Sequence, residues 1–398
     1  MPPSLLIAYD FPPARGGIAR VMGEVARRHP AGSLVVSAGR ARGAEASDAG
    51  FANRIDRMPL ASGRLRVVPG LLLWSRRVAA LARSSNAGFV WAGHLKPTAY
   101  AARWAHERVG VPYGVIVYGG DLLALRHQMQ RSPLQRRTAA ALLGSASVVV
   151  AVSEWTRDLM LALFGELGLT PERVPVRVVP LGADPATFRP GIENGEVRRR
   201  FGIEGGRWML TIGASGPHKG VDTALRALAV LKDRHADLRY AVAGPGRHTE
   251  ALARLADAHG VADRVRFIRE VSEADLPALY NAADIYLGVS RREGRSVEGF
   301  GIALAEAAAC GVPVIAGRSG GIPELISDGE TGLLVDPERT DPLVHAIDRV
   351  LGDPALAHRL GASGRAVVES HFNWDRTTSE LRAIAEGFSR PSPAPRTK

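Results

Sequence analysis

Short runs of apolar residues recur along the first half of the chain, and longer segments of mixed polarity separate them. The runs are SLLIAY (4–9), SLVVSA (33–38), GFVWAG (88–93), YGVIVY (113–118), ASVVVAVS (146–153) and VRVVPLG (176–182). Apolar positions with helical spacing lie between several of them, at 18–29, 98–108 and 133–144. Alternating buried strands and helices predict a mainly parallel, doubly wound sheet.

A segment rich in Pro, Gly and polar residues, 182–196, interrupts this pattern and predicts a linker. The alternation then resumes, with strands expected at 208–213, 238–244, 265–268, 284–289 and 312–317 and helices at 222–234, 250–259 and 275–282. We therefore expect an N-terminal Rossmann-like domain at 1–188 and a second one at 189–373. Residues 374–398 form an amphipathic stretch (374–388), for which packing back on the first domain is one interpretation, and then a tail of disordered composition.

Length and composition agree with two soluble domains. A chain of 398 residues with 46% hydrophobic and 23% charged residues has enough apolar material for two cores. The single cysteine, Cys310, excludes a disulfide within the chain and fits a reducing cytosol. The apolar run at 5–9 is too short for a membrane span or a signal peptide, so we expect a cytoplasmic protein.

The net charge of +11 is confined to the first half, since residues 1–190 have a net charge of +12 and the remainder −1. Such a field attracts nucleic acid, acidic lipid or phosphorylated substrates, although solvated arginines explain it equally well. No nucleic-acid readout module or zinc spacing is present, which argues against nucleic acid. Segments 64–83 and 126–137 contain much of the charge. The first mixes Leu and Trp with Arg, as in a helix on an anionic membrane, but an amphipathic core helix is the favoured interpretation.

The most informative segment is EGFGIALAE (298–306), where two glutamates flank a Gly-Phe-Gly at an expected helix start. Gly299 and Gly301 let the backbone approach a ligand, and the free N–H groups of a helix start attract phosphate. Glu298 and Glu306 would then accept hydrogen bonds from two sugar-like arms of a bound diphosphate. The alternative is a helix-start acid together with a solvated glutamate.

Residues 294–337 contain this glutamate pair followed by ACGVPVIAG, SGGIPE and DGETGLLV, and they resemble the donor site of the family 4 retaining glycosyltransferases. FPPARGG (11–17) and VPLGADPATFRP (179–190) are also typical of that family. The segment before the first glutamate is most similar to the phosphatidylinositol mannoside mannosyltransferase type. The resemblance implies the GT-B fold, in which two Rossmann-like domains face a central cleft. It also implies that the first domain, 1–188, binds the acceptor and that the second, 189–373, binds the nucleotide sugar.

By similarity, Glu298 contacts hydroxyls of the transferred sugar and Glu306 contacts the nucleotide ribose. The other implied donor contacts come from the backbone, namely the amides of Phe300, Gly301 and Ile302 and the loop glycines Gly16 and Gly17. An ordinary tight turn is the alternative for the two loop glycines.

GASGPHKG (213–220) is similar to the basic diphosphate clamp of the family, with Lys219 neutralising the leaving phosphate. A solvated surface lysine is the alternative. The family usually has an arginine where this chain has Ala214, so half of the clamp is missing. Arg291, Arg292 and Arg318 are the candidates to replace it.

Many relatives have a histidine after the strand at 113–118, where this chain has Tyr118. Tyrosine has a pKa near 10 and is a poor base at neutral pH. A retaining enzyme of this kind does not require such a base, because the leaving phosphate helps to deprotonate the acceptor. Asp121 either orients the acceptor or the sugar, or is an acid at a helix start.

These features together predict a retaining glycosyltransferase that moves a hexose, mannose or glucose, from a nucleoside-diphosphate sugar to an acceptor hydroxyl. We expect a saccharide or lipid-linked acceptor, no metal and no cofactor beyond the nucleotide sugar as co-substrate. Peripheral association with the inner membrane face through the basic half is the alternative to a free cytoplasmic state. A catalytically silent sugar-nucleotide-binding subunit and an epimerase of the same fold are the rival functions, and the donor base (GDP, UDP or ADP) stays open.

Overall fold

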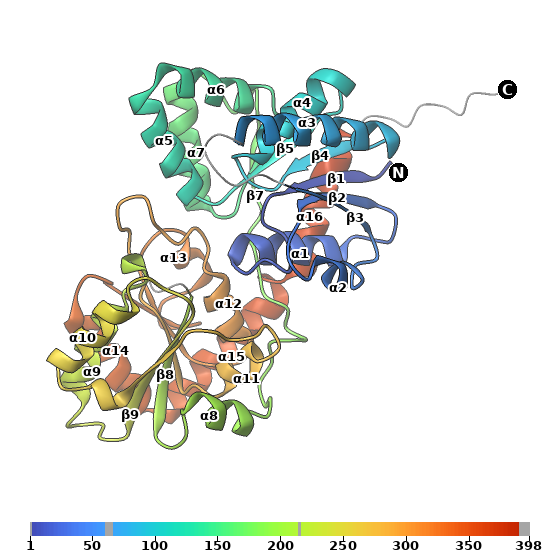
Figure 1. Cartoon of the computed structure of the whole chain (residues 1–398). Coiled ribbons are helices and arrows are strands. Elements are labelled where there is room, and N and C mark those ends of the chain that lie inside the picture. The colour runs from blue at the N-terminus through green and yellow to red at the C-terminus, as the bar shows by residue number, and fades with distance from the viewer. Residues whose placement is uncertain (1, 60–66, 214–215, 390–398) are drawn as a thin grey trace. The chain divides into compact units, whose positions relative to one another are not determined.

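Two parallel sheets organise the molecule, and each belongs to a separate unit (Figure 1). The first unit is Met1–Leu181 with Trp374–Lys398, and the second is Gly182–Asn373. The structure is a computed structural model and describes residues 2–59, 67–213 and 216–389. The predicted doubly wound α/β class is confirmed for both units.

The first sheet has seven strands in the order β3-β2-β1-β4-β5-β6-β7, and every pairing is parallel. The strands are β1 (Ser4–Ala8), β2 (Leu34–Gly39), β3 (Arg54–Met58), β4 (Phe89–Ala92), β5 (Tyr113–Val117), β6 (Val148–Ala151) and β7 (Val176–Val178). The apolar runs predict all of these except β3. The sequence of β3 is RIDRM, and as an edge strand paired with β2 it stays partly exposed and needs no continuous apolar run.

Helices flank this sheet and supply its core. They are α1 (Gly17–Arg28), α2 (Ala44–Asp48), α3 (Val67–Ser84), α4 (Thr98–Val109), α5 (Gly120–Arg131), α6 (Pro133–Gly144), α7 (Glu154–Leu167) and α16 (Trp374–Phe388). Helix α3 buries Trp74 and Val78 and exposes Leu73 and Arg76, so the described part of segment 64–83 is an amphipathic core helix with a mixed outer face. Positions 64–66 lie outside the described residues.

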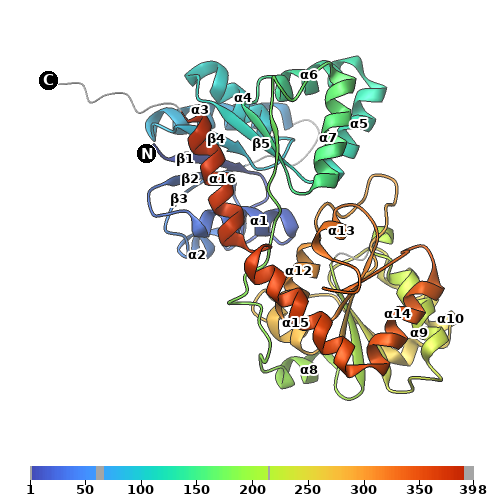
Figure 2. The same ribbon diagram turned by 180° about the vertical axis from the view of Figure 1, so that it is seen from behind.

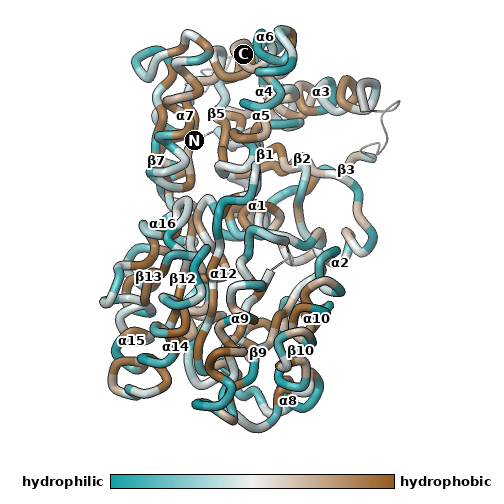
Figure 3. Tube along the Cα trace, turned by 90° about the vertical axis from the view of Figure 1, so that its left-hand side faces the viewer, coloured by the Kyte–Doolittle hydropathy of each residue, from teal (hydrophilic) through white to brown (hydrophobic). Residues whose placement is uncertain are grey.

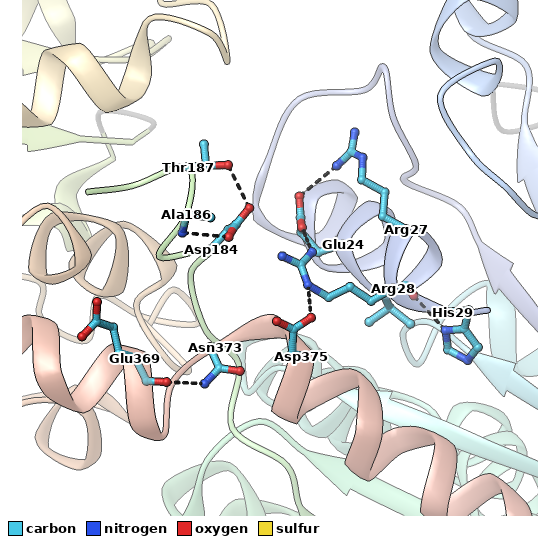
Figure 4. Close-up of polar contacts among 11 residues, drawn as sticks. Glu24, Arg27, Arg28, His29, Asp184, Ala186, Thr187, Glu369, Asn373 and Asp375 are labelled. Carbon is cyan, nitrogen blue, oxygen red and sulfur yellow. Dashed lines mark hydrogen bonds and ion pairs between the residues drawn. The ribbon is translucent and has the colours of Figure 1, made fainter. Parts of the chain in front are cut away.

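Helix α16 returns from the far end of the chain to pack on α1 and β4 (Figure 2). Arg28 on α1 bonds Asp375 on α16, at 2.9 Å from Nε to Oδ1, and also pairs with Glu24 (Figure 4). The Arg376 guanidinium and the Thr377 hydroxyl both donate to the carbonyl of Pro180, at 2.9 and 2.8 Å. These contacts attach α16 to the first unit, to which strand β1 also belongs.

The second sheet has six parallel strands in the order β10-β9-β8-β11-β12-β13. Its strands are β8 (Arg207–Ile212), β9 (Leu238–Ala243), β10 (Val265–Ile268), β11 (Ile285–Gly288), β12 (Val314–Gly317) and β13 (Leu333–Val335). Its helices are α8 (Gly195–Phe201), α9 (Val221–Leu231), α10 (Thr249–Ala258), α11 (Leu276–Asn281), α12 (Ile302–Ala309), α13 (Ile322–Leu325), α14 (Thr340–Gly352) and α15 (Pro354–Ser370), with 3-10 turns η1 (Pro217–Lys219) and η2 (Ala262–Arg264). Along the tube in Figure 3 the helices alternate between hydrophilic and hydrophobic residues, as helices with one buried face do.

The strand order reverses at one point in each sheet, between β1 and β4 in the first and between β8 and β11 in the second. In open parallel sheets, ligands bind outside the carboxyl ends of the strands at such a switch point. The topology therefore predicts ligand sites at the loops that follow β1 and β4 in the first sheet and β8 and β11 in the second. No helix in the described part of the chain is long and apolar enough to cross a membrane.

Candidate functional site

A pocket lies in the second unit at the switch point of its sheet. It is lined by Thr211, Ile212, Lys219, Tyr286, Gly288, Ser290, Glu298, Gly301, Ala303 and Leu304. Two hydroxyl groups of this lining already have hydrogen-bond partners. The Thr211 hydroxyl donates to the carbonyl of Leu287 at 2.7 Å, and the Tyr286 hydroxyl bonds the backbone of Ile212. The charged groups of the lining, Lys219 and Glu298, are therefore the chemically distinctive part of the pocket.

Lys219 and Glu298 form an ion pair across the pocket, with 2.5 Å between Nζ and Oε2. Their side chains are 18% and 23% exposed, so the pair is only partly shielded from water. Burial alone would raise the pKa of Glu298, but the charge and hydrogen bond of Lys219, with a smaller effect from His218, outweigh it and lower the pKa. Glu298 is therefore ionised at neutral pH, and Lys219 holds its carboxylate in place.

Close backbone packing fixes the position of Lys219. Gly220, which follows it, has a positive φ of 66°, and a Cβ there would lie 2.1 Å from the carbonyl oxygen of Val289. Just before Lys219, the His218 carbonyl accepts from the amide of Arg291 at 2.8 Å. The loop that presents the lysine is therefore attached to the chain after β11, and glycine is required at 220.

The predicted SGGIPE turn fixes the position of Glu298. The amide of Gly321 donates to the Glu298 carbonyl at 3.1 Å, and a Cβ on Gly320 would lie 2.1 Å from the same oxygen. Glycine is needed at 320, where φ is 59° and the backbone of Glu298 comes close, whereas Gly321 has a φ of −83° and contributes its amide. This contact is the physical reason for that part of the motif in this chain.

Glu306 is on α12, whose N-terminal cap is Gly301 with a φ of 102°. The Glu306 side chain is 3% exposed, and its Oε2 accepts from the Tyr280 hydroxyl at 2.7 Å. The alternative of a solvated glutamate at this position is therefore wrong. The side chain of Phe300 is buried against Phe372, with 5.7 Å between ring centroids, which leaves its backbone as the group for any ligand contact.

The position of the missing clamp arginine, Ala214, lies outside the described residues. Of the three candidate replacements, Arg291 bonds both carboxylate oxygens of Asp222 at 2.9 and 3.2 Å, and Arg318 pairs with Asp328 at 3.0 Å. Arg292 is exposed and donates to the carbonyl of Gly294. Both Arg291 and Arg318 are thus engaged by acids in this structure.

In the first unit, Gly16 is the N-terminal cap of α1 and Gly17 is the first residue of that helix, and both are exposed. Gly16 has a φ of 131°, and a Cβ there would meet nothing within 4 Å. The conformation of the loop, rather than crowding, requires glycine at 16. The donor contact expected for these two residues stays a prediction.

Tyr118 and Asp121 follow β5 in the same unit. The Tyr118 hydroxyl donates to the carbonyl of Gly93 at 2.9 Å, and burial raises the pKa of this tyrosine well above its ordinary value. Asp121 Oδ1 accepts from the amides of Tyr118 and Leu122, at 3.0 and 2.9 Å. Burial outweighs these bonds and raises the pKa of Asp121 to about 6. Asp121 is an acid in the first turn of α5, as one of the two interpretations held, and it is shielded from water.

Sequence reasoning did not single out Tyr280, His218 or His94. Tyr280 is the partner of Glu306, and His218 lies beside Lys219, where burial and that lysine lower its pKa. His94 is 7% exposed and lies two residues beyond β4. The position of His94 could have been noticed in the sequence, because it directly follows the strand predicted at 88–93. The pairing of Tyr280 with Glu306 could not, because the two residues are 26 positions apart.

Models of two protein families match this chain. The Glycosyltransferase Family 4 model matches residues 15–187, and the Glycosyl transferases group 1 model matches residues 194–367. Each match covers most of one sheet, and the residue pair Glu298 and Glu306 lies in the second.

Curated relatives match over nearly the whole chain. A GDP-mannose-dependent alpha-(1-6)-phosphatidylinositol monomannoside mannosyltransferase of Mycolicibacterium smegmatis is 33% identical, over 96% of this chain and 98% of its own. A GDP-mannose-dependent monoacylated alpha-(1-6)-phosphatidylinositol monomannoside mannosyltransferase of Corynebacterium glutamicum is 28% identical, over 97% and 98%. A D-inositol 3-phosphate glycosyltransferase of Actinosynnema mirum is 39% identical, but over 52% of this chain and 51% of its own.

Solved structures resemble both units. Anabaena Alr3699/HepE in complex with UDP and glucose superposes with a TM-score of 0.77 at 19% identity, over 96% of this chain and 99% of its own. Sucrose-phosphate synthase from Thermosynechococcus elongatus gives 0.76 at 20% identity, over 97% and 99%. The likeness confirms the fold expected from the sequence, two Rossmann-like units of the GT-B type.

Proposed function

The chain belongs to the family 4 glycosyltransferases, and from this membership we propose that it transfers mannose from GDP-mannose to a phosphatidylinositol mannoside. The observation that supports this choice is the 33% identity with the Mycolicibacterium smegmatis mannosyltransferase, because it extends over 96% of the chain and so includes both the donor and the acceptor unit. The D-inositol 3-phosphate glycosyltransferase matches over about half of the chain, which makes its acceptor the weaker candidate.

In this proposal, Lys219 and Glu298 exchange partners when the donor binds. The Lys219 ammonium leaves Glu298 and pairs with the diphosphate. Negative charge grows on the diphosphate as the sugar–phosphate bond breaks, so this ion pair becomes stronger during the reaction. Glu298, an ionised carboxylate, then accepts hydrogen bonds from hydroxyls of the mannose. The ion pair holds both side chains in the lining of the pocket.

Helix α12 binds the other parts of the donor. Its first turn, after Gly301, directs free N–H groups at the diphosphate, and the helix dipole adds to this attraction. Glu306 lies on the same helix and binds the ribose hydroxyls, while the Tyr280 hydroxyl holds one of its oxygens in place. A carboxylate has lone pairs for both tasks.

The acceptor hydroxyl loses its proton to the leaving phosphate, on the same face of the sugar, so the anomeric configuration is retained. Tyr118 fits this scheme because its hydroxyl donates to a backbone carbonyl and its raised pKa makes it a poor base.

Helix α3 is the surface through which the enzyme approaches a lipid acceptor. Leu72 and Leu73 are 37% and 54% exposed on it, next to the exposed Arg76 and Arg77, a composition suited to the surface of an anionic bilayer. Sedimentation with vesicles containing acidic lipid at physiological salt tests this. Leu73→Ser should reduce binding, and Val230→Ser, at a 62% exposed valine of the second unit, should not.

The function is tested by incubating the protein with GDP-mannose and phosphatidylinositol monomannoside and measuring the glycolipid by mass spectrometry. A gain of one hexose supports the proposal, and Glu298→Gln controls for contaminating host enzymes. UDP-glucose and ADP-glucose test the donor base, and D-inositol 3-phosphate tests the rival acceptor. Donor binding without transfer would favour the silent subunit, and an altered sugar nucleotide without acceptor would favour the epimerase.

A further inference from the structure

Arg291 is bonded to the chain on both sides of Lys219. Before the lysine, the carbonyl of His218 accepts from the amide of Arg291 at 2.8 Å. After it, the Arg291 guanidinium donates to both carboxylate oxygens of Asp222, at 2.9 and 3.2 Å, and to the Thr223 hydroxyl at 3.3 Å. Asp222 and Thr223 are in the first turn of α9, so a single residue holds the lysine loop at its two ends.

The guanidinium of Arg291 is committed to Asp222. The two side chains are 15% and 22% exposed, and a pair of N–H···O bonds to one carboxylate fixes direction as well as distance. Burial would lower the pKa of Arg291, but the hydrogen bond and the charge of Asp222 outweigh it and raise the pKa. The ion pair therefore joins the segment after β11 to the start of α9 in one geometry.

These contacts matter for Lys219 because it is the last residue of η1, a single 3-10 turn. Its amide donates to the carbonyl of Gly216 at 3.0 Å, and the hydrogen-bond geometry of 3-10 turns is poorer than that of an α-helix, so contacts from outside are needed to fix it. Ser290, which directly precedes Arg291, lines the same pocket as Lys219. The segment of Arg291 is therefore both part of the pocket lining and the support of the lysine loop.

We infer that Arg291 is a positioning residue for the transfer reaction: it holds the loop so that Lys219 meets the diphosphate, and its own guanidinium stays on Asp222. A displacement of about 1 Å at a reacting group can slow a reaction about 100-fold, so the position of the ammonium decides how well it stabilises the leaving group. A direct phosphate ligand would instead have to leave Asp222. The inference rests on the proposed function for its diphosphate.

A double-variant cycle between Arg291 and Lys219 tests this, with kcat for mannose transfer and GDP affinity by calorimetry as the readouts. Arg291→Met should lower kcat about tenfold. Lys219→Met should lower it about 10- to 100-fold, as expected for a lost charged hydrogen bond. The double variant should be no slower than Lys219→Met and should bind GDP equally well, because the lysine through which Arg291 acts is gone. A purely structural arginine, or one that binds the phosphates, predicts losses that multiply.

Replacing Asp222 separates positioning from direct phosphate binding. Asp222→Ala removes the same bonds as Arg291→Met and should lower kcat and GDP affinity by similar factors, whereas an arginine that binds phosphate would gain GDP affinity once it is freed from its acid. Arg291→Lys keeps the charge but not the planar pair of donors, so kcat should recover only in part. The matched control is Arg226→Met: Arg226 pairs with the same carboxylate at 3.2 Å, but from the next turn of α9 and with 43% of its side chain exposed. This variant should keep kcat within about twofold of wild type.

Multiplying losses in the cycle, a gain of GDP affinity in Asp222→Ala, or full recovery in Arg291→Lys would each overturn the inference. If Arg291→Met does not fold, Asp222→Ala takes its place in the cycle with Lys219→Met. GDP affinity gives the same cycle without an acceptor. A wild-type protein that shows the expected coupling in GDP binding but forms no glycolipid would therefore contradict the proposed function alone.

Discussion

Replacing Lys219 with Met should destabilise the second unit and change how its stability depends on pH. The substitution leaves Glu298 as a partly buried carboxylate without its cation. Exposed pairs contribute about 0–1 kcal/mol, and breaking a buried pair removes about 3–5 kcal/mol. With about a fifth of each side chain exposed, we expect a loss of about 2 kcal/mol at pH 7.

The sign of the pH dependence follows from the pKa of Glu298. In the wild type this pKa is lowered, so the stabilisation is present above the ordinary value of 4.5 and is lost as the pH falls through the folded value. Without Lys219, burial dominates and raises the pKa, so the variant loses stability as the pH rises. The difference in unfolding free energy between wild type and variant should therefore grow from pH 4 to pH 7.

Thermal unfolding of Lys219→Met, Glu298→Gln and the double variant measures the coupling. For a unit of the size of Gly182–Asn373, about 2 kcal/mol corresponds to a Tm change of about 4–8 °C. The double variant should lose clearly less than the sum of the two single variants. The exposed pair Arg318 and Asp328, at 3.0 Å, provides the matched control cycle with little coupling. Additive losses for Lys219 and Glu298, or a difference that shrinks with pH, would refute the reasoning.

Three further predictions concern the same sites. Glu306→Gln should weaken GDP-mannose binding about tenfold or more by calorimetry, whereas Tyr280→Phe should weaken it less; equal affinity in wild type and Glu306→Gln would contradict the ribose contact. Asp121→Asn should raise the unfolding free energy above pH 6 by up to about 3 kcal/mol. The pKa of Asp121 is raised from 3.8 to about 6, so ionisation of this carboxyl destabilises the folded wild type as the pH rises from 4 to 6. Below pH 4 the carboxyl is neutral and the gain should vanish. Gly301→Ala should lower donor affinity and destabilise the protein by about 1–3 kcal/mol, since φ is 102° and the added Cβ would lie 2.7 Å from the Leu304 side chain; a wild-type melting curve and affinity would exclude that strain.

The sequence predicted the central strands because burial on both faces requires continuous apolar runs. Strands β4, β5 and β6 are entirely buried and contain FVWA, YGVIV and VVVA. Strand β3 was missed because an edge strand tolerates the charges of RIDRM. Helix α16 was predicted with its observed bounds, 374–388, from its own amphipathic pattern.

The segment expected to bind the donor could be recognised because its members are close in the sequence, from Glu298 to the turn at Gly320 and Gly321, and its role stays a prediction. The side-chain contacts of its two glutamates could not be predicted. Lys219 reaches Glu298 across 79 positions, and the Tyr280 hydroxyl meets Glu306 from another helix. Such pairs depend on how the strands are ordered in the sheet, and a single sequence contains no local trace of that order.

The most direct test of the account is the product formed from GDP-mannose and phosphatidylinositol monomannoside, with its mass and the configuration of its new linkage determined together. We predict a glycolipid heavier by one hexose, with the mannose in the α configuration of the donor, and no such product from Glu298→Gln. A protein that binds GDP-mannose but forms no glycolipid, or one that forms a β-linked product, would contradict the assignment as a retaining mannosyltransferase.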